Sequence, residues 1–320
     1  SGTLDVLGAT TTKAISATNI IASGDVAVIG NVSGTNVSAS GTLNVSGATT
    51  TQAILATDVT ASGDVAVTGN VSGDNVSASG TLNVSGATTT QAILATDVST
   101  SGNVVATGNV SGTNLSASGT LDVLGATTTK AISATDVTAS GDVAVTGNVS
   151  GTNVSASGTL DVSGVTTTQA ILATDVSASG NVVVTGNVSG TNVSASGTLD
   201  VLGATTAKAI SATDVSASGN VVATGNVSGA NVSASGTLDV LGATTTKAIS
   251  ATDVNASGNV TATGNVNGAN VSASGTLNVA GATTTQAISA TDVSTSGNVV
   301  ATGNVSGTNV NASGTLDVLG

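Results

Sequence analysis

Asn36-Val37-Ser38-Ala39-Ser40-Gly41-Thr42-Leu43-Asn44-Val45 is the stretch of sequence that decides the fold. Its odd-numbered residues are apolar or small and its even-numbered residues are all polar. Successive side chains of an extended strand point to opposite faces, so this alternation predicts a strand with one buried face. The alternation returns between Asp58 and Val67. Val, Thr, Ser, Asn and Gly are mediocre or poor helix formers, and no apolar stripe at helical spacing is present, so a helix is disfavoured.

A repeat of 39 residues carries this pattern along the whole chain. Eight copies fill residues 1–312, and residues 313–320 open a ninth. Each copy divides into halves of 22 and 17 residues, which differ by a five-residue insertion, Ala9 to Lys13 in the first copy. We expect this insertion to be a Thr-rich surface loop. Because repeat arrays normally end in atypical capping units, we interpret residues 1–320 as one array and as an excerpt of a longer chain.

The composition excludes most classes of function. The 320 residues include no Pro, Cys, Met, His, Phe, Trp or Tyr, and 17 acidic residues against 4 Lys give a net charge of −13. An acidic chain repels nucleic acid and anionic membranes, and no run approaches the ~18–20 apolar residues of a membrane-spanning helix. The usual side chains of acid–base and nucleophilic catalysis are missing. We therefore expect no enzyme activity, no cofactor and no catalytic or cofactor-binding residue.

Recurrent Asp residues are the strongest candidates for a metal site, because Ca²⁺ prefers carboxylate and carbonyl oxygens. Other acidic positions exchange with Asn, as Asp64 does with Asn103, and the glycine-rich nonapeptide of calcium-binding β-rolls is absent. Solvated, outward-facing carboxylates are therefore the preferred interpretation, and no metal site is assigned. The Asp residues that recur every 39 residues are Asp58, Asp97, Asp136, Asp175, Asp214, Asp253 and Asp292.

Three weaker motifs remain. The tripeptides that begin at Asn31 and Asn36 match the N-glycosylation sequon, which is a weak pattern in a chain this rich in Asn and Ser. The Thr run 10–12 is interpreted as a polar turn, with an ordered Thr array of the ice-binding kind as the alternative. Copies with Leu at their seventh position have Ser at their sixteenth, and several copies reverse the pair, as Ser46 and Leu55 do. Either the side chains at these two positions are in contact, or gene duplication has rearranged two ancestral forms of the repeat.

Two architectures satisfy the pattern, and both are all-β. One repeat buries too few aliphatic side chains to fold alone, so units must stack. In a trimeric β-helix or β-spiral shaft, three chains bury their Val and Leu faces against one another, and Ala39 and Gly41 allow close approach. In a monomeric parallel β-solenoid, each half-repeat forms one coil, and residues such as Val59 and Val76 form ladders. An elongated trimeric fibre is the preferred prediction, and the solenoid is the alternative.

The units SGTLDVLGATTTKAISATDV (residues 118–137) and SGDVAVTGNVSGTNVSA (residues 140–156) resemble the Gly/Ser/Thr/Val repeats of bacteriophage tail fibres and related bacterial surface fibres. Their Leu-x-Val elements are similar to those of trimeric viral fibre shafts, although the chain lacks the Pro that adenovirus-type shafts carry at turns. The resemblance implies a homotrimeric extracellular spacer on a virion tail or cell-surface appendage. It also implies that the receptor-binding tip lies outside this segment.

The expected function is therefore that of a structural extracellular fibre shaft, a stiff spacer that presents a distal adhesin or receptor-binding tip. The alternatives are a monomeric β-solenoid adhesin, an ice-binding surface, or a filament-forming extracellular matrix protein. The expected partners are other copies of the chain, in a homotrimer, and a distal receptor. Nucleic acid binding and membrane insertion are not expected.

Overall fold

The structure is a computed structural model that describes residues 2–319. No helix occurs among these residues, which confirms the all-β prediction. The chain forms two compact units, Ser1–Val162 and Ser163–Gly320. The strands of the first unit are β1 Thr3–Val6, β2 Thr10–Thr12, β3 Ile15–Ala22, β4 Val26–Val28, β5 Val32–Val45, β6 Thr49–Thr51, β7 Ala53–Ala61, β8 Val65–Val67, β9 Val71–Ser72, β10 Asn75–Val84, β11 Thr88–Thr90, β12 Ala92–Thr100, β13 Val104–Ala106, β14 Val110–Val123, β15 Thr127–Ala139, β16 Val143–Val145, β17 Val149–Ser150 and β18 Asn153–Val162.

The second unit repeats the same succession of short and long strands. Its strands are β19 Thr166–Thr168, β20 Ala170–Ala178, β21 Val182–Val184, β22 Val188–Val201, β23 Thr205–Ala217, β24 Val221–Ala223, β25 Val227–Val240, β26 Thr244–Ala256, β27 Val260–Ala262, β28 Val266–Val279, β29 Thr283–Thr295, β30 Val299–Ala301, β31 Val305–Ser306, β32 Asn309–Ala312 and β33 Leu316–Val318.

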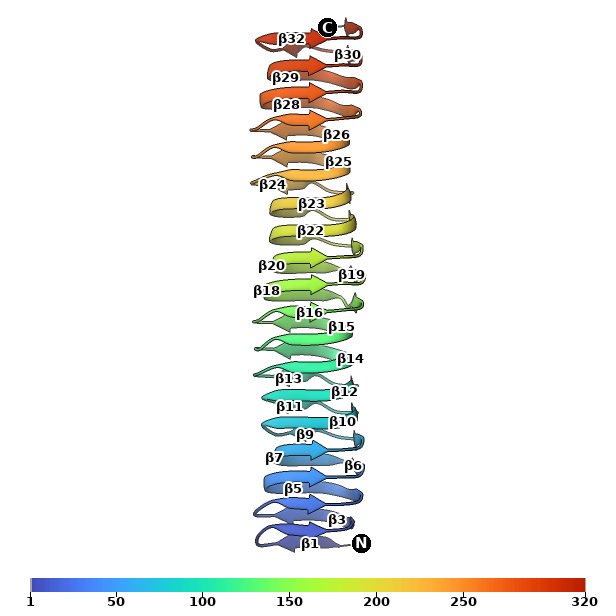
Figure 1. Cartoon of the computed structure of the whole chain (residues 1–320), viewed down its shortest axis with the longest axis vertical. Helices are drawn as coiled ribbons and strands as arrows, with labels where there is room; N and C mark the ends of the chain where they lie inside the picture. Colours follow the sequence, from blue (N-terminus) through green and yellow to red (C-terminus); the bar gives the residue numbers. More distant parts are fainter. Residues whose placement is uncertain (1, 320) are drawn as a thin grey trace. The chain divides into compact units, whose positions relative to one another are not determined.

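Within each unit the strands pair in parallel with strands one coil further along the chain, where a coil is one circuit of the chain about the stack axis. Leu43 pairs with Val59, 16 residues on, and Val59 pairs with Val76, 17 residues on. Figure 1 shows the coils of each unit following one another in sequence order. Each unit is therefore a parallel β-solenoid, the architecture predicted as the alternative, and the predicted ladder of Val59 and Val76 is confirmed.

Every coil has three sides. A side is a short straight segment with an inward residue, an outward residue and a second inward position. The seven sides of the second copy begin with the buried residues Leu43, Thr49, Ile54, Val59, Val65, Val71 and Val76, and are numbered 1 to 7 in that order. Side 1 stacks under side 4, and side 4 stacks under side 7, so three sides complete a coil.

Seven sides do not divide evenly into coils of three, so the repeat and the coil are out of phase. A ladder that starts at Leu43 crosses seven coils before it meets side 1 again at Leu160, three repeats later. One 39-residue repeat thus makes two and a third coils, and each face displays all seven sides in turn. This ladder is Leu43, Val59, Val76, Ile93, Val110, Thr127, Val143 and Leu160.

Two sequence predictions about the coil are wrong. The Thr insertion is a side and not a surface loop: in the second copy it forms β6, where Thr49 is fully buried and Thr51 is 4% exposed. For the same reason the prediction that each half-repeat is one coil fails for the 22-residue half, which contains four sides, whereas the 17-residue half contains the three sides of one coil. The alternation predicted the inward aliphatic residues such as Leu43 and Val59, but neither the inward Thr49 and Thr51 nor the number of sides that close a coil.

The core of each unit is a column of aliphatic side chains from a single chain. Leu43, Leu82 and Leu121 are fully buried, as are Leu199, Leu238 and Leu277 in the second unit. The Val and Leu faces that the trimeric shaft would bury between chains are therefore buried within one chain. Gly41 was predicted to face this core, but it does not. The strand pairing shifts between Ala39 and Thr42 and places Gly41 at a corner, where one side ends and the next begins.

Candidate functional site

The carboxylate and amide side chains at the corners bind the backbone of the next coil. Asp64 Oδ1 accepts the N–H of Thr81 at 2.8 Å, and Asn103 Oδ1 accepts the N–H of Thr120 at 3.0 Å. Asn70 Oδ1 accepts the N–H of Ala87 in the same way, at 2.9 Å. Asp and Asn offer the same acceptor oxygen, so their exchange between copies keeps the hydrogen bond. These residues are structural caps between coils.

The Asp residues that recur every 39 residues have a second structural role. Asp58 Oδ1 accepts a hydrogen bond from Asn75 Nδ2 at 2.8 Å, and Asp97 and Asp136 accept the equivalent bond from Asn114 and Asn153. These Asp residues do not stack on one another, because each copy advances by two and a third coils. No group of three metal-binding side chains occurs among residues 2–319.

The Thr residues of side 2 are split between the core and the surface. Thr49 is buried, and its hydroxyl has no hydrogen-bond partner among the described residues. Thr51 Oγ1 lies 2.8 Å from the carbonyl oxygen of Thr35. The outward Thr50 pairs with Ser33 below it and Ala66 above it, so no column of Thr forms at this position. The expected polar turn is thus a strand with two inward hydroxyls.

The sequons and the exchanging leucines lie on the surface. The Asn31 side chain caps Ala48 and that of Asn36 donates to Asn19, so both sequon amides take part in contacts between coils. Leu55 is the sixteenth residue of its copy and the outward residue of side 3, and it pairs with Ser38 and Ser72 in the neighbouring coils. The seventh residue of the copy, Ser46, directly follows side 1 of the same coil. The register places these two positions on different faces and gives no support to a contact between them.

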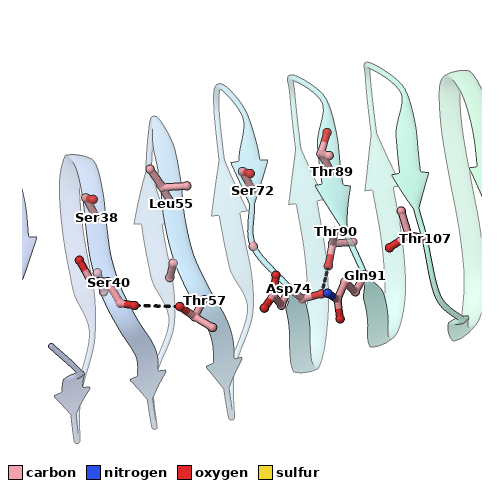
Figure 2. A pocket seen from close by; sticks show the side chains of 13 residues that line it. Ser38, Ser40, Leu55, Thr57, Ser72, Asp74, Thr89, Thr90, Gln91 and Thr107 are labelled. Carbon is pink, nitrogen blue, oxygen red and sulfur yellow. Dashed lines mark hydrogen bonds between the residues drawn. The ribbon is translucent and has the colours of Figure 1, made fainter. Parts of the chain in front are cut away.

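An open recess of about 500 Å³ lies beside Leu55 and is the candidate site of this molecule. Figure 2 shows its wall of outward residues on one face and its row of corner residues beside them. Ala39, Ala56, Gly73 and Thr90 also line it. The wall consists of Ser38, Leu55, Ser72 and Thr89, and the corner residues are Ser40, Thr57, Asp74, Gln91 and Thr107.

Short corners account for the position of this recess. Sides 3, 6 and 2 stack in three successive coils, through the pairs Ile54–Val71 and Val71–Thr88. The first residue of each of these sides is five residues before the first residue of the next side along the chain, as Ile54 is before Val59. For the sides that lie before and after them in the stack this spacing is six residues, as from Val37 to Leu43. The missing residue leaves the corner indented over three coils, a height of ~14 Å at the usual strand spacing.

The same recess recurs one repeat later with different chemistry. A second recess of about 380 Å³ is lined by Leu94, Thr96 and Thr113, which correspond to Leu55, Thr57 and Asp74. Asp74 occurs only in the second copy, since the other copies have Thr or Ala at this position. The recess was not predicted from the sequence, although the one carboxylate at an otherwise Thr or Ala position was a visible signal.

Comparison of the chain with protein-family models, curated proteins and solved structures found no match. Among residues 2–319, no helix has the length and apolar character needed to cross a membrane.

Proposed function

We propose that this chain is a structural shaft segment that acts as a stiff extracellular spacer and presents an adhesin or receptor-binding tip. The observation that carries the proposal is the register of the repeat. Each copy adds seven sides in an unchanged stacking order, so length grows with copy number, by ~11 Å per copy at ~4.8 Å per coil. Parallel pairing along every coil also resists bending, because strands of successive coils are hydrogen-bonded to each other.

The use of the polar side chains supports the same proposal. Asp and Asn at the corners join one coil to the next, and so do the Asp58–Asn75 pair and its equivalents. The composition suits exposed conditions, since only four Lys offer tryptic sites and no Met or Cys offers an oxidation site. The resemblance to bacteriophage tail-fibre repeats supports a place on a virion tail or a cell-surface appendage.

The arrangement of the sides bears on two other expectations, the ice-binding surface and the homotrimer. An ice-binding surface needs hydroxyls aligned on one face, whereas Thr50, Thr89 and Thr128 occupy three different faces of the first unit. A homotrimer remains a prediction, and the shaft does not require it, because one chain buries its own aliphatic side chains. Light scattering decides this point: a native mass of 29.5 kDa indicates a monomer.

Deletion of a whole repeat tests the spacer function. Removing residues 79–117 joins side 7 of one copy to side 1 of the next, so we expect the melting temperature to stay within ~2 °C and the maximum dimension from X-ray scattering to fall by ~11 Å. The matched control removes residues 79–114, which joins the inward Ala78 directly to the inward Leu115 and breaks the alternation. Equal loss of stability in both variants, or an unchanged dimension in the first, argues against a modular spacer.

A further inference from the structure

The recess at Asp74 holds two polar side chains that the fold does not use. The backbone of Asp74 is fully engaged: its N–H donates to the Thr57 carbonyl, and its own carbonyl accepts from Gln91 N–H and Thr90 Oγ1. Its carboxylate makes no hydrogen bond within residues 2–319, and the same is true of the Gln91 carboxamide. Figure 2 shows both side chains at neighbouring corners of the recess. They are free to bind a ligand.

The remaining lining defines what that ligand must offer. No Lys lines the recess, so an anion would meet the Asp74 carboxylate without a compensating charge. A ligand must instead donate hydrogen bonds to this carboxylate, while Gln91 and the hydroxyls of Ser40, Ser72 and Thr107 both donate and accept. Leu55 stands on the wall with 58% of its surface exposed and offers an apolar contact.

These features together fit a neutral polyol ring with one face of C–H groups. We propose that the Asp74 recess binds a single sugar residue of the hexopyranose class. Its adjacent hydroxyls would bind the Asp74 carboxylate and the Gln91 carboxamide, and its C–H face would pack on Leu55. The recess is open and shallow, so we expect millimolar affinity for a monosaccharide. The site is independent of the spacer function, and the deletion experiment above does not depend on it.

The repeat itself supplies variants that preserve the fold. Asp74→Thr introduces the residue found at Thr35 and Thr113, and Leu55→Ser introduces the residue found at Ser16. Asp64→Asn is the matched control, because it removes one negative charge outside the recess and introduces the residue that caps the equivalent corner at Asn103.

Ligand-observed NMR titration of the full chain with glucose, galactose and mannose tests the proposal, with CaCl₂ and ethylammonium chloride titrated separately. We expect saturable binding of at least one hexose, a loss of affinity of at least fivefold in Asp74→Thr, a smaller loss in Leu55→Ser, and no change in Asp64→Asn. The absence of saturable hexose binding overturns the proposal, as does hexose binding that Asp74→Thr leaves unchanged. Binding of only Ca²⁺ or the ammonium ion, removed by Asp74→Thr, assigns the recess to cations and also overturns it.

Discussion

Thr127 and Thr129 lie two residues apart on β15, and both are buried in the core of the first unit, yet only one hydroxyl is satisfied. Thr129 Oγ1 lies 2.9 Å from the carbonyl oxygen of Thr113 and 3.1 Å from that of Ala131. Thr127 Oγ1 has no partner among the described residues. The first inward position of side 2 therefore carries a desolvated hydroxyl in a column otherwise made of Val, Ile and Leu.

Replacing these unsatisfied hydroxyls with methyl groups is expected to stabilise the chain. Val has nearly the shape of Thr, and an unpaired buried hydroxyl costs about 1–2 kcal/mol, so each Thr→Val change should raise the free energy of unfolding by about that amount. A combined variant should raise the melting temperature, measured by circular dichroism, by several degrees. The sites to replace together are Thr49, Thr88, Thr127, Thr166, Thr205, Thr244 and Thr283.

The control for this prediction uses the neighbouring position. Thr129→Val removes a hydroxyl whose single proton has the carbonyl oxygens of Thr113 and Ala131 within hydrogen-bond distance, so it should lower the free energy of unfolding by about 1 kcal/mol. If Thr127→Val and Thr129→Val shift stability in the same direction, the assignment of satisfied and unsatisfied hydroxyls is wrong.

The corner glycines should be intolerant of side chains wherever a coil lies beneath them. A Cβ at Gly47 would clash with Asn31 Oδ1 and with the backbone of Gly30, so Gly47→Ala should cost about 1–3 kcal/mol. Gly8 holds the same place in the first copy and has nothing within 4 Å of a built Cβ. In a chain of residues 1–320, Gly8→Ala should therefore leave the melting temperature unchanged. Equal effects of the two substitutions would contradict the close stacking at this corner.

The corner caps should depend on the acceptor oxygen and not on the charge. Asp64→Asn keeps the oxygen that accepts the Thr81 N–H, so stability should stay within ~0.3 kcal/mol, whereas Asp64→Ala should cost about 0.5–1 kcal/mol. Urea denaturation of both variants gives the comparison. An Asn variant as unstable as the Ala variant would show that the carboxylate charge matters at this corner.

Excision of the Thr segment distinguishes a side from a surface loop. Removing residues 48–52 deletes β6 with the buried Thr49 and Thr51, and it removes the hydrogen bond between Asn31 and Ala48. We expect a clear fall in melting temperature of the full chain, because sides near the deletion must stack on new partners. A surface loop of five residues would be lost at little cost. An unchanged melting curve would therefore restore the loop interpretation.

The sequence alone determined which aliphatic residues face inward and that the units must stack, either within one chain or between three chains. The alternation from Val37 to Val45 predicts an inward Val, Ala and Leu, and all three are buried. It misplaced Gly41, because strict alternation across residues 36–45 hides the corner between Ala39 and Thr42. The presence of Asp74 at a position otherwise occupied by Thr or Ala was visible in the sequence, but its unpaired carboxylate and its neighbours in the recess were not.

Only the tertiary structure decided the number of sides in a coil. That number determines which side of one copy stacks on which side of the next. Alternation reports whether a side chain points in or out, which is a property of neighbouring residues. The closure of a coil depends on hydrogen bonds between residues 16 or 17 apart, as Leu43 and Val59 or Val59 and Val76 are. A repeat of 39 residues does not contain a whole number of such steps. The spread of Asp and Thr over three faces and the indentation beside Leu55 follow from that mismatch.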